Sequence, residues 1–517
     1  MPGWLGKKNK GQTTVFLSLA LVLIISLICT LLESARSEGL RLRLQTAANA
    51  AIASAFSMYD IQVWERYGLL FFADRIGNGQ EFREVVDRYT GLNTREDDAV
   101  GGDWISFSEA SSADISYVQA TDDHGEVFVR AVCTYMRQCG LIREIKDMQE
   151  QWNSAREKIS GLDLTNSEGE LDLGRIGNLL EQVQEGLKSS VEITDGAGLP
   201  SGGDGEGNGE GAGAAAEESA EAMSLSQALE IFAGLSQKLE NWRRRGLLMV
   251  VCSRVPEVSE KPISRAALPS ALGGESKDRR AGEPMDHDLI DNLIFREYLL
   301  THLNSYREKP GEMLELEYTL TGKDSDLASL SSTVKRLAAV RTGLNYIFLQ
   351  THSDYRLEIA GAAAALAILV GSGEAVEAIE MLLTLLWALA EAVCDVRMLM
   401  DGKRVPLIKE EQDWQLSLRG AALADESGEG GGRGLEYKDY IRLLLYLAGT
   451  DTLAYRAMDC IQIFARKKDS DFLMKNCIYA ARISIDGKSG SGFPFLPGEL
   501  EYTLRAGTAF SYGEIEY

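Results

Sequence analysis

The sequence is poor in the residues that build most recognisable catalytic and metal sites. Its 517 residues include only four histidines and seven cysteines. No histidine lies in an HExxH pair, the cysteines show no paired CxxC spacing, and no GxSxG turn occurs. The acidic residues are too numerous to single out a catalytic pair. We therefore expect no enzyme activity, no metal and no cofactor, and we expect the cysteines to be buried thiols.

Two short motifs resemble binding sites but have simpler explanations. Asp286-His287-Asp288 has metal-binding side chains, yet the same residues suit the start of a helix. Gly487-Lys488-Ser489 resembles the end of a phosphate-binding loop, but Arg482 stands where that motif requires a glycine. Asp486-Gly487 favours a hairpin turn instead.

Basic residues are also scarce relative to acidic ones. The chain has 53 Lys and Arg against 77 Asp and Glu, which gives a formal net charge of −24. Binding to nucleic-acid phosphates requires clustered Lys and Arg. The composition therefore argues against DNA or RNA as a partner.

One long apolar run lies near the N-terminus. Val15 to Leu32 contains no charge, and thirteen of its residues are Leu, Ile, Val or Phe. This is long enough to span a bilayer and longer than the apolar core of a secretory signal, and Glu33 is unsuited to a cleavage site. Ile28 is too bulky for a lipoprotein box before Cys29. We predict a permanent transmembrane helix at 11–33.

The residues beside this run predict its orientation and its continuation. Lys7, Lys8 and Lys10 precede it without a neighbouring acid, so the N-terminus should be cytoplasmic and the rest outside. The helix should continue to about Trp64 as a spine, because small and apolar residues recur at helical spacing. That stripe consists of Leu40, Leu44, Ala47, Ala51 and Ala55.

Small and hydroxyl-bearing residues interrupt the apolar run. Such residues let neighbouring transmembrane helices approach closely. We expect this helix to pack against others through Ser18, Ala20, Ser26 and Thr30.

Five stretches of the sequence together carry a resemblance to other proteins: KGQTTVFLSLALVLIISLICTLLESAR, YDIQVWERYGLLFF, LEYTLTGKDSDLASLSSTVKRLAAVRTGLNYIF, LLWALAEAVCDVRMLMDGKRVPLIKEEQDW and LEYKDYIRLLLYL. With these stretches the chain resembles a family of membrane-anchored surface proteins from Gram-positive anaerobes, associated with tight-adherence (Flp-type) pilus loci. The resemblance implies location at the cell surface and association with pilus or secretion-system proteins.

The N-terminus departs from that of true pilins. Pilins are cut after a glycine and carry a glutamate five residues later, whereas the fifth residue after Gly11 is Phe16. The sequence is therefore more similar to the uncut, TadG-like class of membrane-bound pilus-associated proteins. Processing between Gly11 and Gln12 remains the alternative.

The patterns along the whole sequence predict a mainly α, α+β fold. We expect a long transmembrane and spine helix, a helical body and a small antiparallel sheet. We expect strands at 113–120, 247–255, 313–322 and near the C-terminus, and a loop-rich connection at 61–105. We expect helices at about 124–160, 173–193, 223–245, 326–350 and 435–468, and a buried helical hairpin at 357–400. The hexapeptide ELEYTL occurs at 315–320 and 499–504, which indicates two similar strands, a duplication or coincidence.

These patterns predict seven segments along the chain. They are a basic cytoplasmic flank at 1–10, the transmembrane helix at 11–33, a spine helix and first part of the extracellular body at 34–195, a flexible Gly- and Glu-rich linker at 196–220, a helix and strand at 221–255, a flexible loop at 256–287, and a helical hairpin core with C-terminal strands at 288–517.

The sequence thus favours a single-pass membrane protein with a structural or interaction role, attached to a pilus or secretion system. One alternative is a minor pilin released after Gly11. A second is an extracellular ligand-binding module with an apolar pocket near 357–400. A surface hydrolase is the third, and it would need clustered carboxylates or histidines.

Overall fold

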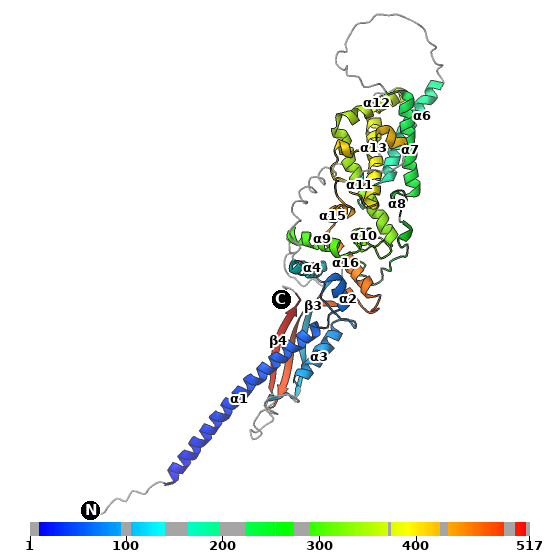
Figure 1. The fold of residues 1–517 in the computed structure, drawn as a ribbon. Helices are drawn as coiled ribbons and strands as arrows, with labels where there is room; N and C mark the ends of the chain where they lie inside the picture. The colour runs from blue at the N-terminus through cyan, green and yellow to red at the C-terminus, as the bar shows by residue number, and fades with distance from the viewer. Residues whose placement is uncertain are drawn as a thin grey trace, which may run out of the picture. The chain divides into compact units, whose positions relative to one another are not determined.

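The structure, a computed structural model, describes residues 10–94, 105–139, 164–195, 223–253, 255–272, 289–370, 374–423, 433–490 and 502–512. Helices account for 66% of it, and four strands form one small antiparallel sheet, which confirms the predicted mainly α, α+β fold. The chain forms two compact units (Figure 1). Unit 1 comprises 1–140, 266–291 and 458–517, and unit 2 comprises 141–265 and 292–457. The expected linker at 196–220 and residues 273–287 of the expected loop lie outside the described residues.

Unit 1 begins with one uninterrupted helix, α1 (Lys10–Phe56). The predicted continuation of the apolar segment into a spine is confirmed, although the helix ends eight residues before Trp64. It ends there because Asp60 starts a new helix, α2 (Ile61–Tyr67). The Asp60 carboxylate accepts hydrogen bonds from the backbone N–H groups of Gln62 and Val63.

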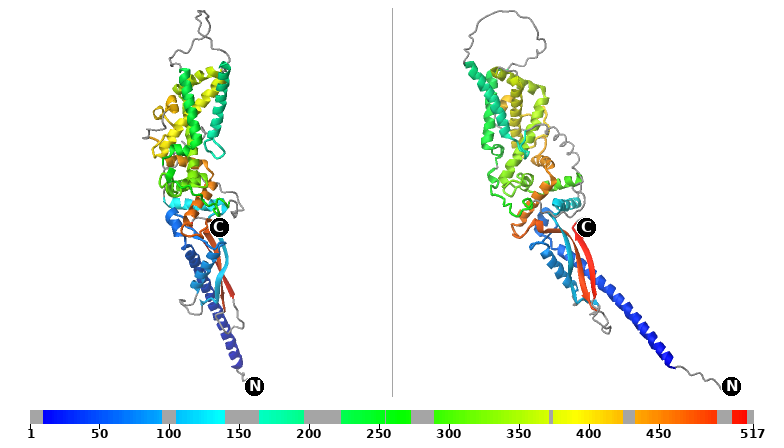
Figure 2. Two further views of the ribbon diagram at one scale, coloured as in Figure 1. Left: turned by 90° about the vertical axis from the view of Figure 1, so that its right-hand side faces the viewer. Right: turned by 180° about the vertical axis from the view of Figure 1, so that it is seen from behind.

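The sheet of unit 1 is arranged around β3 (Cys477–Ser489), which pairs antiparallel with the other three strands. These are β1 (Phe72–Ala73), β2 (Glu109–Gln119) and β4 (Tyr502–Ser511). Figure 2 shows the C-terminal half of α1 running alongside these strands. Buried residues of α1, of α3 (Gln80–Thr94) and of β3 and β4 form one hydrophobic core. The strand predicted at 113–120 and the C-terminal strands are confirmed.

Helix α3, together with α2 and β1, occupies much of the described part of the segment expected to be loop-rich, 61–105. Its Phe82, Val85 and Val86 are buried on one helical face. The turn before it is fixed by Asp74, whose buried carboxylate accepts hydrogen bonds from the backbone N–H groups of Gly77, Gly79 and Glu81. The prediction was wrong because the charges and glycines of this segment obscure a short apolar stripe.

Unit 2 is a helical body in which α11 (Asp326–Thr351) and α12 (Ser353–Val370) both pack against α13 (Glu374–Met400). The predicted helical hairpin at 357–400 is therefore confirmed. The Ser325 hydroxyl accepts the Ala328 N–H at 3.2 Å and caps α11. The predicted helices at 173–193 and 223–245 correspond to α6 (Leu173–Asp195) and α7 (Leu225–Arg245).

Two predicted strands are wrong, because both segments are helical. The stretch 313–322 contains α10 (Glu315–Thr321), whose seven residues are all buried, so its alternating pattern does not mark one exposed face. The stretch 247–255 contains α8 (Leu247–Val251), and a short apolar run of this length does not distinguish a buried helix from a buried strand. The two ELEYTL copies are consequently not two similar strands, since the first is helical and Tyr502–Leu504 of the second lie in β4.

The other helices follow the sequence patterns with shorter bounds. The described part of the helix expected at 124–160 is α4 (Glu126–Cys139), and 435–468 forms two helices, α15 (Tyr437–Leu447) and α16 (Thr450–Ala465). The remaining helices are α9 (Leu289–His302) and α14 (Leu418–Leu423), with 3₁₀ turns at Asp123–Gly125, Val255–Glu257, Glu411–Asp413 and Met474–Asn476.

Candidate functional site

The N-terminal half of α1 presents its apolar side chains outward. Between Val15 and Leu32, the exposed fractions of the large apolar residues range from 44% at Leu32 to 73% at Phe16. Thr13 to Leu32 measures about 30 Å at 1.5 Å per residue, which matches the hydrocarbon core of a bilayer. Among the described residues, α1 is the one helix long and apolar enough to cross a membrane.

The C-terminal half of the same helix is a buried spine. All five residues of the predicted stripe, Leu40, Leu44, Ala47, Ala51 and Ala55, are 0–2% exposed. The small size of its three alanines allows α1 to lie close to the sheet and to α3. One continuous helix therefore joins an exposed apolar segment directly to the hydrophobic core of unit 1 (Figure 1).

The change from exposed to buried occurs at the first charged residues after the apolar run. Arg36 is only 6% exposed, and its guanidinium donates to Glu33 at 3.0 Å and to the Ser489 hydroxyl at 2.8 Å. Ser489 is the last residue of β3. This contact fixes the point at which α1 leaves the sheet.

Gly487 lies within β3 rather than in the predicted hairpin turn. A Cβ atom at this position would lie 2.7 Å from Phe107 Cδ1 and 3.1 Å from Leu44 Cδ1. The glycine is therefore required by the close packing of α1 against the strand, and the Gly487-Lys488-Ser489 motif belongs to the sheet.

The structure places the predicted packing residues of the anchor on the exposed half of α1. The hydroxyl groups of Ser18, Ser26 and Thr30 donate to the carbonyl oxygens of Val15, Leu23 and Leu27, so no hydroxyl donor is left unsatisfied there in an apolar surrounding. Ala20 is half-buried. Gly11 and Gln12 lie in the first turn of α1, Lys10 begins it, and Lys7 and Lys8 lie outside the described residues.

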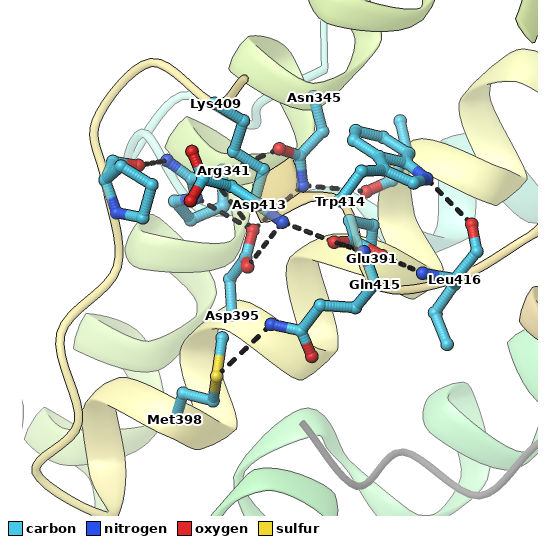
Figure 3. A network of polar contacts seen from close by, with 12 residues as sticks. Arg341, Asn345, Glu391, Asp395, Met398, Lys409, Asp413, Trp414, Gln415 and Leu416 are labelled. Carbon is cyan, nitrogen blue, oxygen red and sulfur yellow. Dashed lines mark hydrogen bonds and ion pairs between the residues drawn. The ribbon is translucent and has the colours of Figure 1, made fainter. Parts of the chain in front are cut away.

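Unit 2 contains a second feature, a network of four buried charges that the sequence analysis did not find (Figure 3). Arg341 comes from α11, Glu391 and Asp395 come from α13, and Lys409 comes from the segment after α13. All four are at most 5% exposed. The Arg341 guanidinium donates to Asp395 at 2.9 Å, and the Lys409 ammonium pairs with Asp395 at 2.8 Å and with Glu391.

Hydrogen bonds to neutral groups complete this network. The remaining N–H groups of Arg341 donate to the carbonyl oxygens of Pro406 and Leu407, each at 2.9 Å, and to Asn345 at 3.1 Å. Glu391 accepts from the backbone N–H groups of Gln415 and Leu416, each at 3.0 Å. The four charges cancel, and their bonds tie the segment 404–416 to α11 and α13.

The charges within the network set the protonation of its acids. Burial alone would raise the pKa of Asp395, but Arg341 and Lys409 outweigh burial and hold that pKa below its usual range. Burial raises the pKa of Glu391, and the Lys409 ammonium opposes this shift. Asp395 is therefore the permanent counter-ion of the two cations.

An aromatic layer covers one side of the network. The rings of Phe348 and Trp414 stack with their centroids 4.7 Å apart, and Trp387 lies edge-on to Trp414 at 5.9 Å. The Lys409 ammonium lies 5.2 Å from the Trp414 ring centroid. Another side opens into a pocket of about 350 Å³, which includes Asp395, Lys409 and Gln415 in its lining.

Some histidines and cysteines lie within or beside these two features, because Cys29 is in the apolar half of α1 and Cys394 directly precedes Asp395 in α13. His302 stacks on Tyr298 and His352 on Phe348, and burial lowers the pKa of His302. Within the described ranges, no three His, Cys, Asp or Glu side chains gather as a metal site would require. All seven cysteines lie in described residues, and none forms a disulfide. Five are buried as expected, whereas Cys29 is partly exposed and Cys139 is exposed. His287 lies outside the described residues.

The spacing of charged residues in the sequence indicates only part of this network. Glu391 and Asp395 are four residues apart within the apolar helix α13, which places two acids on one buried face. Their cationic partners lie elsewhere in the chain, so the pairing required the fold.

The fold and the apolar segment together define a mainly α, α+β protein with one N-terminal helix that can anchor in a membrane. The chain belongs to a family of unknown function, DUF5702, whose model matches residues 229–489, just over half of the chain. That match includes β3, most of unit 2 and all four members of the charged network. Neither the curated proteins nor the solved structures contain a match to the chain.

Proposed function

We propose that this protein is a membrane-anchored structural and interaction protein, with its bulk outside the cell, that associates with a Flp-type (tight-adherence) pilus or secretion system. The observation that carries the anchoring is the division of α1 into an exposed apolar half and a buried spine. The pilus association rests on the sequence resemblance.

Energetics supports insertion of the apolar half into lipid. Thirteen large apolar side chains, each favouring insertion by roughly 0.3–0.6 kcal/mol, together favour it by about 4–8 kcal/mol. Insertion would hold the body at the membrane, because the spine continues the inserted segment as one helix into the core of unit 1. A cleaved signal sequence has the same composition in its apolar part but would leave unit 1 with a truncated α1.

The proposed orientation and contacts follow from the flanking residues. Lys7, Lys8 and Lys10 would hold the N-terminus in the cytoplasm. Ser18, Ala20, Ser26 and Thr30 would form the side of the helix that approaches helices of the pilus machinery.

A minor pilin remains the second candidate, because α1 follows the plan of a pilin helix, with an exposed half and a half packed on a sheet. The two candidates differ in their mature N-terminus. An uncut anchor retains residues 1–10, whereas a pilin would begin at Gln12. Mass spectrometry of the intact protein from membranes therefore separates them.

The partner is tested by cross-linking in native membranes. A photoreactive residue at Ser26 should capture a tight-adherence component, whereas the same residue at Met249, an exposed position in unit 2, should not capture that component through the anchor helix. Recovery of the protein from the soluble fraction would refute the anchor. Recovery from membranes with no pilus component captured would refute the association alone.

A further inference from the structure

The pocket beside the buried network is lined by more positive than negative charge. Arg404, Lys409 and Arg433 contribute three cations, and Asp395 and Asp413 contribute two anions. Arg404 and Lys409 also pair with Glu436 and Glu391, but neither glutamate lines the pocket. Lys409 also pairs with Asp395 of the lining, so Arg433 is the cation of this lining that makes no ion pair with a described residue.

The fold brings together the backbone segments that carry the two arginines of this pocket. Val405 and Leu435 form an antiparallel bridge with hydrogen bonds of 3.0 and 2.9 Å, so Arg404 and Arg433 come from adjacent segments. Gly434 has a φ of +114°, and a Cβ there would lie 2.3 Å from the Pro406 nitrogen. Only glycine permits this approach, which brings Arg433 to the pocket.

Two side chains of the lining have unused hydrogen-bonding capacity within the described residues. Arg433 is exposed and makes no ion pair there. The Gln415 side-chain N–H group donates only to the Met398 sulfur, at 3.3 Å, which is a weak acceptor (Figure 3). The Gln415 oxygen accepts no hydrogen bond from a described residue. Both groups are available to a ligand.

We infer that this pocket binds a small molecule that bears a carboxylate or phosphate group. The acidic group lies between the guanidinium groups of Arg404 and Arg433, whose planar donors match both kinds of anion. Gln415 contributes a further donor. The volume of about 350 Å³ suits a ligand of metabolite size. This site is in unit 2 and does not depend on the proposed anchor.

Binding is tested on the full-length protein in detergent by isothermal titration calorimetry with succinate and with inorganic phosphate, each against sodium chloride at equal ionic strength. We expect saturable binding of at least one of them. Binding of succinate alone identifies a carboxylate ligand, and binding of phosphate alone identifies a phosphate ligand. Absence of saturation for both at millimolar concentration would overturn the inference.

Variants locate the bound anion. Arg433→Gln and Arg404→Gln should each raise the dissociation constant at least about tenfold, because each removes a charge-assisted hydrogen bond. Arg419→Gln is the matched control, since Arg419 is also a surface arginine of unit 2 with one glutamate partner but does not line the pocket. An equal loss of affinity in the control would show that the anion binds elsewhere.

Discussion

Replacement of Arg341 by Met should destabilise unit 2 more than any surface charge substitution. Met preserves much of the side-chain volume but removes the guanidinium. Asp395 then loses donors at 2.9 and 3.0 Å, and the carbonyl oxygens of Pro406 and Leu407 each lose one at 2.9 Å. Arg341 and Asp395 are both fully buried, so water does not replace these bonds.

The expected loss is about 3–5 kcal/mol in the free energy of unfolding of unit 2, the range found when one partner of a buried ion pair is removed. Domains have only about 5–15 kcal/mol of stability, so this loss is a large part of the total. The exposed pair of Arg419 and Glu230 provides the comparison, and Arg419→Met should change stability by less than about 1 kcal/mol.

Hydrogen exchange followed by mass spectrometry measures the loss separately in each unit. Peptides from α13 and from 404–416 should exchange faster in Arg341→Met, whereas peptides from β3 should not change. Arg341→Met combined with Asp395→Asn should cost less than the sum of the two single substitutions, because it leaves the neutral pair of Lys409 and Glu391. A loss below about 1 kcal/mol in Arg341→Met, or strict additivity, would refute the view that the network fastens 404–416 to the helices.

Two further substitutions test other buried positions. Burial raises the pKa of Glu317 from 4.5 to about 7. The folded state therefore holds this proton more tightly than the unfolded state, and the stability of unit 2 should fall by up to about 3 kcal/mol as the pH rises from about 4.5 to 7. Urea unfolding should show this loss in the native protein but not in Glu317→Gln. A pH dependence shared by both proteins would assign the effect to other groups. Gly487→Val should destabilise unit 1 by about 1–3 kcal/mol, measured by thermal unfolding, because the new side chain clashes with Phe107. Gly507→Val is the control and should be tolerated, because a Cβ at that strand position meets only Ile483 O, at 3.8 Å.

Helix α1 could be predicted well from the sequence because each of its halves has a local cause. The composition of Val15–Leu32 fixes the exposed apolar half, and the spacing of Leu40, Leu44 and Ala47 fixes the buried face. The charged network could not be predicted in the same way. Its members lie at 341, 391, 395 and 409, and they meet only because α11 packs against α13 and the segment after α13 returns to both helices.

The two copies of ELEYTL show where prediction from local pattern fails. In α10, Glu315 and Glu317 accept hydrogen bonds from the backbone N–H groups of Asn304 and Tyr306, and all surrounding surfaces are protein. In β4, Tyr502–Leu504 pair with β3, and exposed and buried residues alternate from Thr503 onward. The three letters YTL, which are described in both copies, therefore form a helix or a strand according to what surrounds them. Alternation predicts a strand only where one face meets water, so a segment buried on every side retains no sequence record of its conformation.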